Sequence, residues 1–184
     1  MSEPGDSSPS PLPADVTTEP EDPPRLAVDI VREGGDWSAF GAVEDVVCAA
    51  AGALALRLAL PAGSEASVVL GSDALVRRLN RAYRGKDAAT NVLSFPFQKP
   101  PGAQAVLVSY LGDVVLAAET VAREADEQAI PPRHHLQHLV VHGLLHLLGR
   151  DHQTDAEAEA MEQLEVDILR AIGVADPYAA PAAP

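Results

Sequence analysis

The segment 133–152, RHHLQHLVVHGLLHLLGRDH, contains all six histidines of the chain. His142 and His146 are four residues apart, about one helical turn, so on a helix their imidazoles can grip one metal ion. Apolar residues recur here every three to four positions, which predicts an amphipathic helix with one face in the core. These residues are Leu136, Leu139, Val140, Leu144, Leu147 and Leu148.

Gly149 is expected to end this helix, because glycine readily takes the left-handed conformation that a helix C-terminus commonly needs. The chain can then reverse and bring His152 towards His142 and His146. Three neutral nitrogen ligands with a fourth position for water are typical of a catalytic zinc site. Asp151 is a candidate acceptor for a ring N–H. We predict one Zn²⁺ per chain at these three histidines, although they also suit nickel, copper or iron.

The remaining histidines of the segment are rival ligands. His138 and His146 are eight residues, or about 12 Å, apart along a helix. Two nitrogens that bind one zinc ion at about 2 Å each cannot be so far apart. We therefore expect His134, His135 and His138 to face solvent or to line a groove.

The position after the first ligand is Gly143. In the metalloprotease motif H-E-x-x-H this position is a glutamate that serves as general base. A metallopeptidase is therefore disfavoured. Without this glutamate, a metal-bound water must act alone or with a group from elsewhere in the chain. This favours a substrate whose reacting centre can be held by positive charge.

Several separated segments, in the same order, resemble motifs of the YbeY endoribonucleases, which are metal-dependent rRNA maturation factors of bacteria. The resemblance runs from about Leu79 to Tyr178. One departure is Arg150, where the family usually has tyrosine; this is not a ligand position, so only the local surface is affected. The segments are LNRAYRGKDAATNVLSFPF (79–97), LGDVVL (111–116), HLVVHGLLHLLGRDH (138–152), MEQLE (161–165) and DPY (176–178).

The resemblance implies a single-strand-specific endoribonuclease that acts in 16S rRNA 3′-end maturation and ribosome quality control. Its expected partners are single-stranded RNA, rRNA precursors, and the ribosome or small-subunit proteins, with no DNA. Arg84 matches the arginine of the family's Y-R-G-K-D motif and joins the three histidines as a catalytic candidate. Its guanidinium suits a phosphate or the charge of a transition state. A structural ion pair with Asp87 or another carboxylate is the alternative role.

A second function class remains open: a non-catalytic, metal-stabilised ribosome assembly factor. A structural zinc normally has a fourth protein ligand, and Asp151 is adjacent in sequence to His152. A metal coordination position left open for water would distinguish a catalytic site from a structural one.

A net charge of −14 argues against nucleic-acid binding, which depends on Lys and Arg, but the charges are unevenly distributed. Residues 1–24 contain six acids and no base, and residues 155–167 contain six more acids. Five of the thirteen basic residues lie within ten positions, and such a local basic face can still bind a phosphate backbone. They are Arg77, Arg78, Arg81, Arg84 and Lys86. For Arg77 and Arg78, an ordinary solvated helix face is an equal alternative.

Composition and length predict one globular domain. We expect a disordered, acidic, Pro-rich tail at 1–24, a single metal-dependent endoribonuclease domain at 25–178, and a flexible tail at 179–184.

The longest apolar stretch, 46–60, is too short to span a bilayer, and we expect it to form a buried helix. No signal peptide is seen, so we expect a cytoplasmic protein. The single cysteine, Cys48, is expected to be a small core residue.

Mixed strands and helices without a regular βαβ repeat predict an α+β fold: a small mixed β-sheet with helices packed against it, and the metal site on a central helix and the turn after it. Pro96 marks its strand as an edge, and an edge strand beside the metal helix could hold an extended substrate. Segments 105–110 and 111–117 could form a hairpin or one bent strand. The predicted strands are 26–31, 66–70, 91–97 and these two segments. The predicted helices are 38–58 with Ser38 as N-cap, one capped by Ser72 or Asp73, 119–128, one that starts at Pro131-Pro132, and 154–172 with Thr154 as N-cap. From residue 177 onward we expect a tail.

Overall fold

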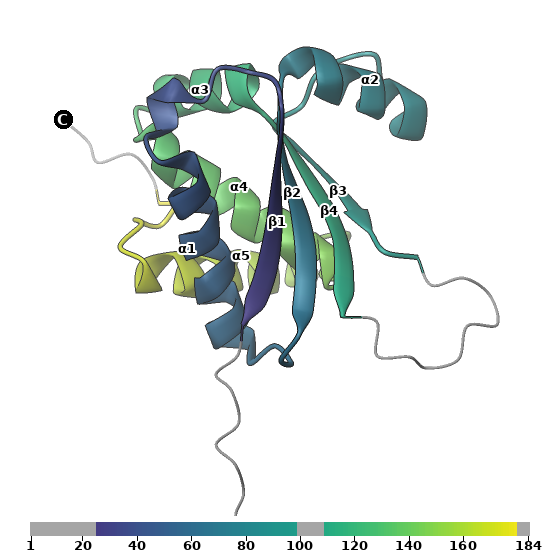
Figure 1. Ribbon diagram of the computed structural model, residues 1–184. Helices are drawn as coiled ribbons and strands as arrows, with labels where there is room; N and C mark the ends of the chain where they lie inside the picture. Colours follow the sequence, from purple (N-terminus) through teal and green to yellow (C-terminus); the bar gives the residue numbers. More distant parts are fainter. Residues whose placement is uncertain (1–24, 99–108, 180–184) are drawn as a thin grey trace, which may run out of the picture.

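The computed structural model describes residues 25–98 and 109–179, and its centre is a four-stranded mixed sheet (Figure 1). The strand order is β1-β2-β4-β3. β1 and β2 are parallel, β2 and β4 are parallel, and β3 is antiparallel to β4. The predicted α+β fold and the edge position of the strand with Pro96 are thus confirmed. The strands are β1 (Leu26–Glu33), β2 (Ser64–Gly71), β3 (Val92–Pro96) and β4 (Tyr110–Ala117).

Alternating residues of β4 build two separate cores, because successive side chains of a strand point to opposite faces of the sheet. Val114 and Leu116 belong to the main core, which lies between the sheet and the long helices. Val115 and Ala117 belong to a smaller core on the other face, together with Val76. β4 is therefore covered on both faces, and it joins the two cores.

The first helix differs from its predicted extent of 38–58. Ser38–Phe40 is a separate 3₁₀ turn, and α1 (Val43–Leu58) begins only after it, with Ala42 rather than Ser38 at its N-cap. Gly41 has φ +74°, which interrupts a helix and separates the two elements. Cys48 is exposed on α1, so its predicted core position is wrong. The buried face of α1 is instead built from alanines, Val43, Val47 and Leu54.

α2 (Asp73–Arg84) begins at Ser72, whose hydroxyl accepts a hydrogen bond from the Leu75 backbone N–H at 3.4 Å. Gly85 ends α2 with φ +69°. The last helix, α5 (Asp155–Ala171), begins with a capping box between Thr154 and Glu157. Both N-caps follow the prediction, since Ser and Thr satisfy free N–H groups at helix starts.

The histidine helix, α4 (Pro132–Leu147), is more central than the predicted amphipathic helix. Val141 and Leu145 are buried together with the residues of the predicted stripe up to Leu147, and so are the polar His135 and Gln137, whereas Leu148 is only partly buried. It follows α3 (Ala118–Glu127) and packs against α1, α3, α5 and the sheet (Figure 1). A helix enclosed on most sides holds its few accessible side chains in fixed positions.

Some expectations lie outside the described residues. These are the tails 1–24 and 180–184 and most of the predicted strand 105–110, so the choice between a hairpin and a bent strand is not decided. Within the described ranges, no helix has the length and apolar character needed to cross a membrane.

Candidate metal centre

The C-terminus of α4 is built as the position of Gly149 predicts. Gly149 has φ +76°, its N–H donates to the carbonyl of His146 at 3.0 Å, and the N–H of Arg150 donates to the carbonyl of Leu145 at 3.0 Å. This pair of bonds is the Schellman arrangement, which ends a helix and reverses the chain. The reversal carries His152 back towards the end of α4.

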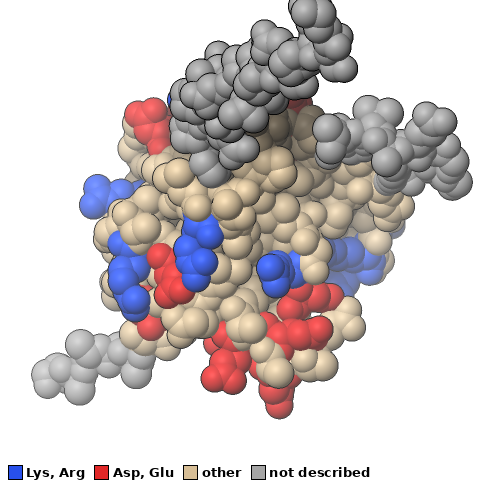
Figure 2. Space-filling view, turned by 90° about the horizontal axis from the view of Figure 1, so that it is seen from below, with Lys and Arg blue, Asp and Glu red and all other residues tan. Residues whose placement is uncertain are grey.

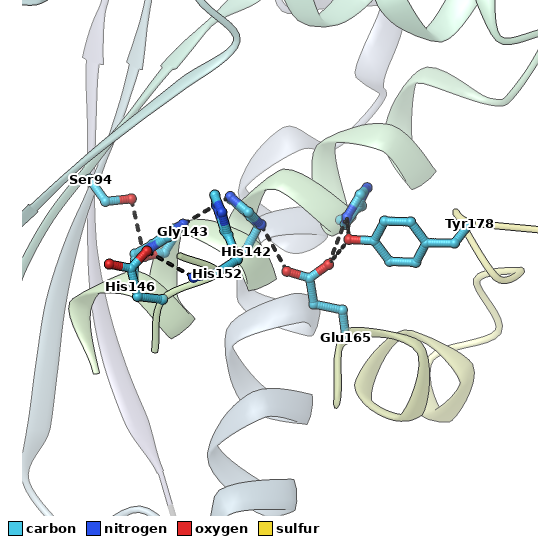
Figure 3. A network of polar contacts seen from close by, with 9 residues as sticks. Ser94, His142, Gly143, His146, His152, Glu165 and Tyr178 are labelled. Atoms are coloured by element: carbon cyan, nitrogen blue, oxygen red, sulfur yellow. Dashed lines mark hydrogen bonds and ion pairs between the residues drawn. The ribbon is translucent and has the colours of Figure 1, made fainter. Parts of the chain in front are cut away.

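The three predicted ligands lie together (Figure 3). One ring nitrogen from each of His142, His146 and His152 lies within 4.8 Å of the other two. The Nε2 atoms of His142 and His146 are 3.1 Å apart, a separation that suits two nitrogens bound at about 2 Å to one zinc ion. The donor set and its spacing therefore fit a transition-metal ion.

Glu165 of α5 fixes the orientation of His142. Its Oε1 atom lies 2.8 Å from Nδ1 of His142, and the carboxylate is fully buried. Burial alone would raise the pKa of Glu165, but hydrogen bonds from His138, His142 and Tyr178 outweigh it and lower this pKa to about 2. An ionised carboxylate only accepts, so Nδ1 of His142 must donate, and its Nε2 keeps a lone pair for a metal.

The other oxygen of Glu165, Oε2, accepts from Nε2 of His138 at 3.0 Å and from the hydroxyl of Tyr178. Tyr178 thus attaches the C-terminal segment to α4 and α5 (Figure 3), which corrects the expectation that the chain is a free tail from residue 177. The hydroxyl is also 3.1 Å from Nε2 of His138. Both residues support the site without belonging to the triad.

Two of the rival histidines are not solvent-facing. His135 is buried and its Nε2 lies 2.8 Å from Glu124, while His138 is committed to Glu165. Both line a pocket beside the triad, so the groove-lining alternative holds for them. His138 also stays out of the ligand cluster, as the distance along the helix predicts.

Burial lowers the pKa of His146, and the neighbouring His142 and His152 add to this effect. The imidazole is therefore neutral at neutral pH, which is the state that binds a metal. His146 lies near the C-terminal end of α4 and lines a cleft.

Gly143 lets α4 approach the sheet closely. A Cβ atom there would lie 2.7 Å from Cγ1 of Val114, and Ser94 of β3 donates a hydrogen bond to the Gly143 carbonyl at 3.2 Å. The position that carries the glutamate base in metalloproteases is thus buried against β4 and β3. This geometry supports the argument against a metallopeptidase.

Arg84 lines the same cleft as the three histidines, a cavity of about 560 Å³ between β3, the end of α2 and the turn 149–152. The alternative ion pair of Arg84 with Asp87 does not form. Asp87 instead accepts two hydrogen bonds from Arg77, at 2.8 and 3.0 Å. Among the described residues, the Arg84 guanidinium has no hydrogen-bond or ion-pair partner and is available to a ligand.

Asp151 does not act as predicted. Its carboxylate accepts from the backbone N–H of His152 at 2.8 Å and from the side chain of Gln153 at 2.6 Å. It shapes the turn after α4, and Glu165 takes the role of acceptor for a ligand ring. Arg150, the position that departs from the family pattern, is exposed and is a second arginine among the residues that line the cleft.

The net charge of −14 is unevenly distributed over the surface. On the face shown in Figure 2, several acidic side chains gather at the lower edge, while elsewhere on this face Lys and Arg side chains lie next to acidic ones. The overall charge therefore does not describe the local potential at the cleft, where Arg84 and Arg150 meet the triad.

Comparison with known proteins identifies the family of this chain. The family model described as Endoribonuclease YbeY matches residues 40–173. The chain belongs to the YbeY endoribonuclease family. It is 49% identical over 161 residues to Endoribonuclease YbeY of Parvibaculum lavamentivorans, covering 84% of this chain and 86% of that protein. It is 47% identical over 159 residues to that of Azorhizobium caulinodans, covering 85% of this chain and 99% of that protein.

A solution structure of a Thermotoga maritima protein is 21% identical, with a TM-score of 0.48, and the match covers 83% of this chain and 99% of that one. The YbeY motifs of the sequence are brought together by the fold. Glu165 ends the MEQLE segment and Tyr178 ends DPY, so both motifs were visible in the sequence, but their contacts with His142 and His138 were not predicted.

Proposed function

We propose that this chain is a metal-dependent, single-strand-specific endoribonuclease that acts in 16S rRNA 3′-end maturation and ribosome quality control. Family membership makes it an endoribonuclease, a hydrolase that acts on RNA. The metal, the preference for single strands and the ribosomal role are the proposal. The observation that carries it is that Arg84 and the triad of His142, His146 and His152 line one cleft.

The histidines and Arg84 would have different roles in the reaction. His142, His146 and His152 would hold the ion, with Glu165 orienting the first. When bound there, Zn²⁺ or another transition metal would supply a Lewis acid for the scissile phosphate and a water of lowered pKa. Arg84 would donate two N–H groups to phosphate oxygens and stabilise the charge that develops during cleavage.

The surface around the cleft supports a single strand as substrate. β3 is an edge strand, and its Ser94 and Pro96 line the cleft. Tyr83, 71% exposed, and Phe97, 45% exposed, are sequence neighbours of the lining residues Arg84 and Pro96, and their rings pack edge to face on Phe95 and Tyr110. The exposed faces of aromatic rings can stack on the unpaired bases of single-stranded RNA.

The alternative is a metal-stabilised ribosome assembly factor without catalysis. A structural zinc normally has four protein ligands. Asp151, the candidate for the fourth, has both carboxylate oxygens in hydrogen bonds with His152 and Gln153. The three-histidine set therefore favours a catalytic site. For either role, we propose rRNA precursors, the ribosome or small-subunit proteins as partners and the cytoplasm as location.

The test is cleavage by the purified full chain of one RNA in single-stranded and duplex form, and of a precursor with the unprocessed 3′ end of 16S rRNA. We expect cleavage of the single strand and of the precursor end, loss of activity with a chelator, and no activity in His146→Ala. If the metal-loaded protein binds ribosomes but cleaves none of these RNAs, the assembly-factor role replaces the nuclease.

A further inference from the structure

A second pocket of about 410 Å³ adjoins the catalytic cleft, and nothing in the proposed chemistry uses it. It shares Asn91, Val92 and His142 with the cleft. Its size falls within the range of small-molecule sites, about 300–1,000 Å³. A nucleotide whose phosphate lies at the triad could thus place its base in the second pocket without bridging a gap.

The two cavities differ in charge. Arg84 and Arg150 line the cleft, whereas no Lys or Arg of the described ranges lines the second pocket, and Glu124 is among its lining residues. A phosphate would be repelled by Glu124 and find no cation there. An uncharged, planar base suits the pocket, because Val92 and Leu139 provide apolar walls.

Glu124 presents one free acceptor. Its Oε2 atom is occupied twice, by Nδ2 of Asn91 at 2.9 Å and by Nε2 of His135 at 2.8 Å. Its Oε1 atom has no hydrogen-bond partner among the described residues, and the side chain remains 27% exposed. The carboxylate can therefore accept one further hydrogen bond from a ligand in the pocket.

His135 holds this carboxylate in place. Burial lowers the pKa of His135, which favours the neutral ring, and its Nδ1 atom is buried without a partner. The single ring proton is therefore placed on Nε2, where it meets Glu124. The amide of Asn91 is fixed in turn, because its Oδ1 accepts from the Val92 backbone N–H at 2.7 Å.

We propose that this pocket binds a nucleobase next to the scissile phosphate and selects bases with an exocyclic amino group through Oε1 of Glu124. This proposal rests on the proposed endoribonuclease function and adds a base preference to it. Cytosine presents its N4 amino group as a donor to a carboxylate, whereas uracil presents the O4 acceptor at the same position. The pocket should therefore favour cytosine over uracil.

Two matched RNAs test the preference: fluorescein-labelled C10 and U10, which differ only in this edge of the base. Binding is measured by anisotropy with the full chain in chelator, so that the RNA stays intact, and cleavage rates are then measured with zinc. We expect C10 to bind about tenfold more tightly than U10, as for one hydrogen bond to a charged group. An oligomer of N4,N4-dimethylcytidine, which lacks the donor, should behave as U10 does.

Glu124→Gln is the decisive variant. An amide oxygen in the Oε2 position can still accept from Asn91 and His135, while the NH₂ group takes the Oε1 position and becomes a donor. The preference for C10 should disappear or reverse towards U10. Glu127→Gln, which makes the same charge change at an exposed position of α3 outside the pocket, should keep the wild-type ratio.

Each outcome decides one question. Equal binding and cleavage of C10 and U10 by the wild type, or an unchanged ratio in a folded Glu124→Gln protein, overturns the base pocket and leaves the nuclease intact. If Glu124→Gln fails to fold, the dimethylcytidine oligomer decides: binding equal to C10 overturns the proposal. If the zinc-loaded wild type cleaves neither RNA, the proposed function itself fails.

Discussion

The carboxylate of Glu165 accepts a hydrogen bond from Nδ1 of His142 at 2.8 Å, although the residues are 23 positions apart on different helices. This contact sets the tautomer of His142 and turns its Nε2 towards His146. It gives the candidate metal centre a support that the local sequence around the histidines does not contain.

Replacing Glu165 by glutamine should weaken metal binding about 10- to 100-fold, the usual cost of losing a charged partner behind a ligand histidine. Competition with a metal-sensitive dye measures the affinity. Glu159→Gln, with the same charge change at an exposed position of α5, serves as control. Unchanged affinity in Glu165→Gln would show that the buried carboxylate does not orient the ligand.

Alanine at His142, His146 or His152 should each remove the bound metal, because two imidazoles rarely retain a catalytic ion. His138→Ala should keep one ion per chain at saturating metal, since His138 contacts Glu165 and lies outside the ligand cluster. Elemental analysis of the purified variants gives the metal content. Full occupancy in His152→Ala would refute the three-histidine site, and an empty His138→Ala protein would mean that His138 is a ligand.

Gly143→Ala should lower the free energy of unfolding, because the added methyl group would lie 2.7 Å from Val114 and such overpacking costs about 1–3 kcal/mol. The roughly 1 kcal/mol that alanine gains over glycine in a helix offsets part of this cost, which leaves a net loss of up to about 2 kcal/mol. Denaturant unfolding measures the change. Val114→Ala should restore part of the loss in the double variant, whereas a Gly143→Ala protein as stable as the wild type would contradict the close contact.

Deleting residues 1–24 should leave the melting temperature and the activity unchanged. The segment has no periodic apolar pattern that could add to the core. Thermal unfolding and RNA cleavage of the truncated chain check this, with the full chain as reference. A clear fall in melting temperature would show that the segment packs on the domain.

The sequence predicted the triad because its geometry is local. One helical turn separates His142 from His146, and a single glycine decides where the chain reverses towards His152. The caps at Ser72 and Thr154 were predictable for the same reason, since each depends on contacts within three residues.

Contacts between distant segments could not be predicted in this way. Asp151 is adjacent to His152, a proposed ligand, yet its carboxylate is occupied by its own turn, and Glu165 from another helix contacts a triad histidine instead. Asp87 could pair with either Arg77 or Arg84, and only the path of the loop after α2 decides for Arg77. Cys48 has apolar neighbours in the sequence, but its face of α1 points away from the core.

The cleft shared by Arg84 and the triad is proposed to cleave RNA, and the decisive measurement is single-turnover cleavage of a short single-stranded RNA. Metal-loaded wild type should cleave, and His146→Ala should not. Arg84→Ala should keep its metal and fold but lose about 3 kcal/mol or more of transition-state stabilisation, roughly a hundredfold in rate. Arg84→Lys should also fail, because lysine cannot donate in bidentate fashion. Equal cleavage by wild type and His146→Ala would contradict the account.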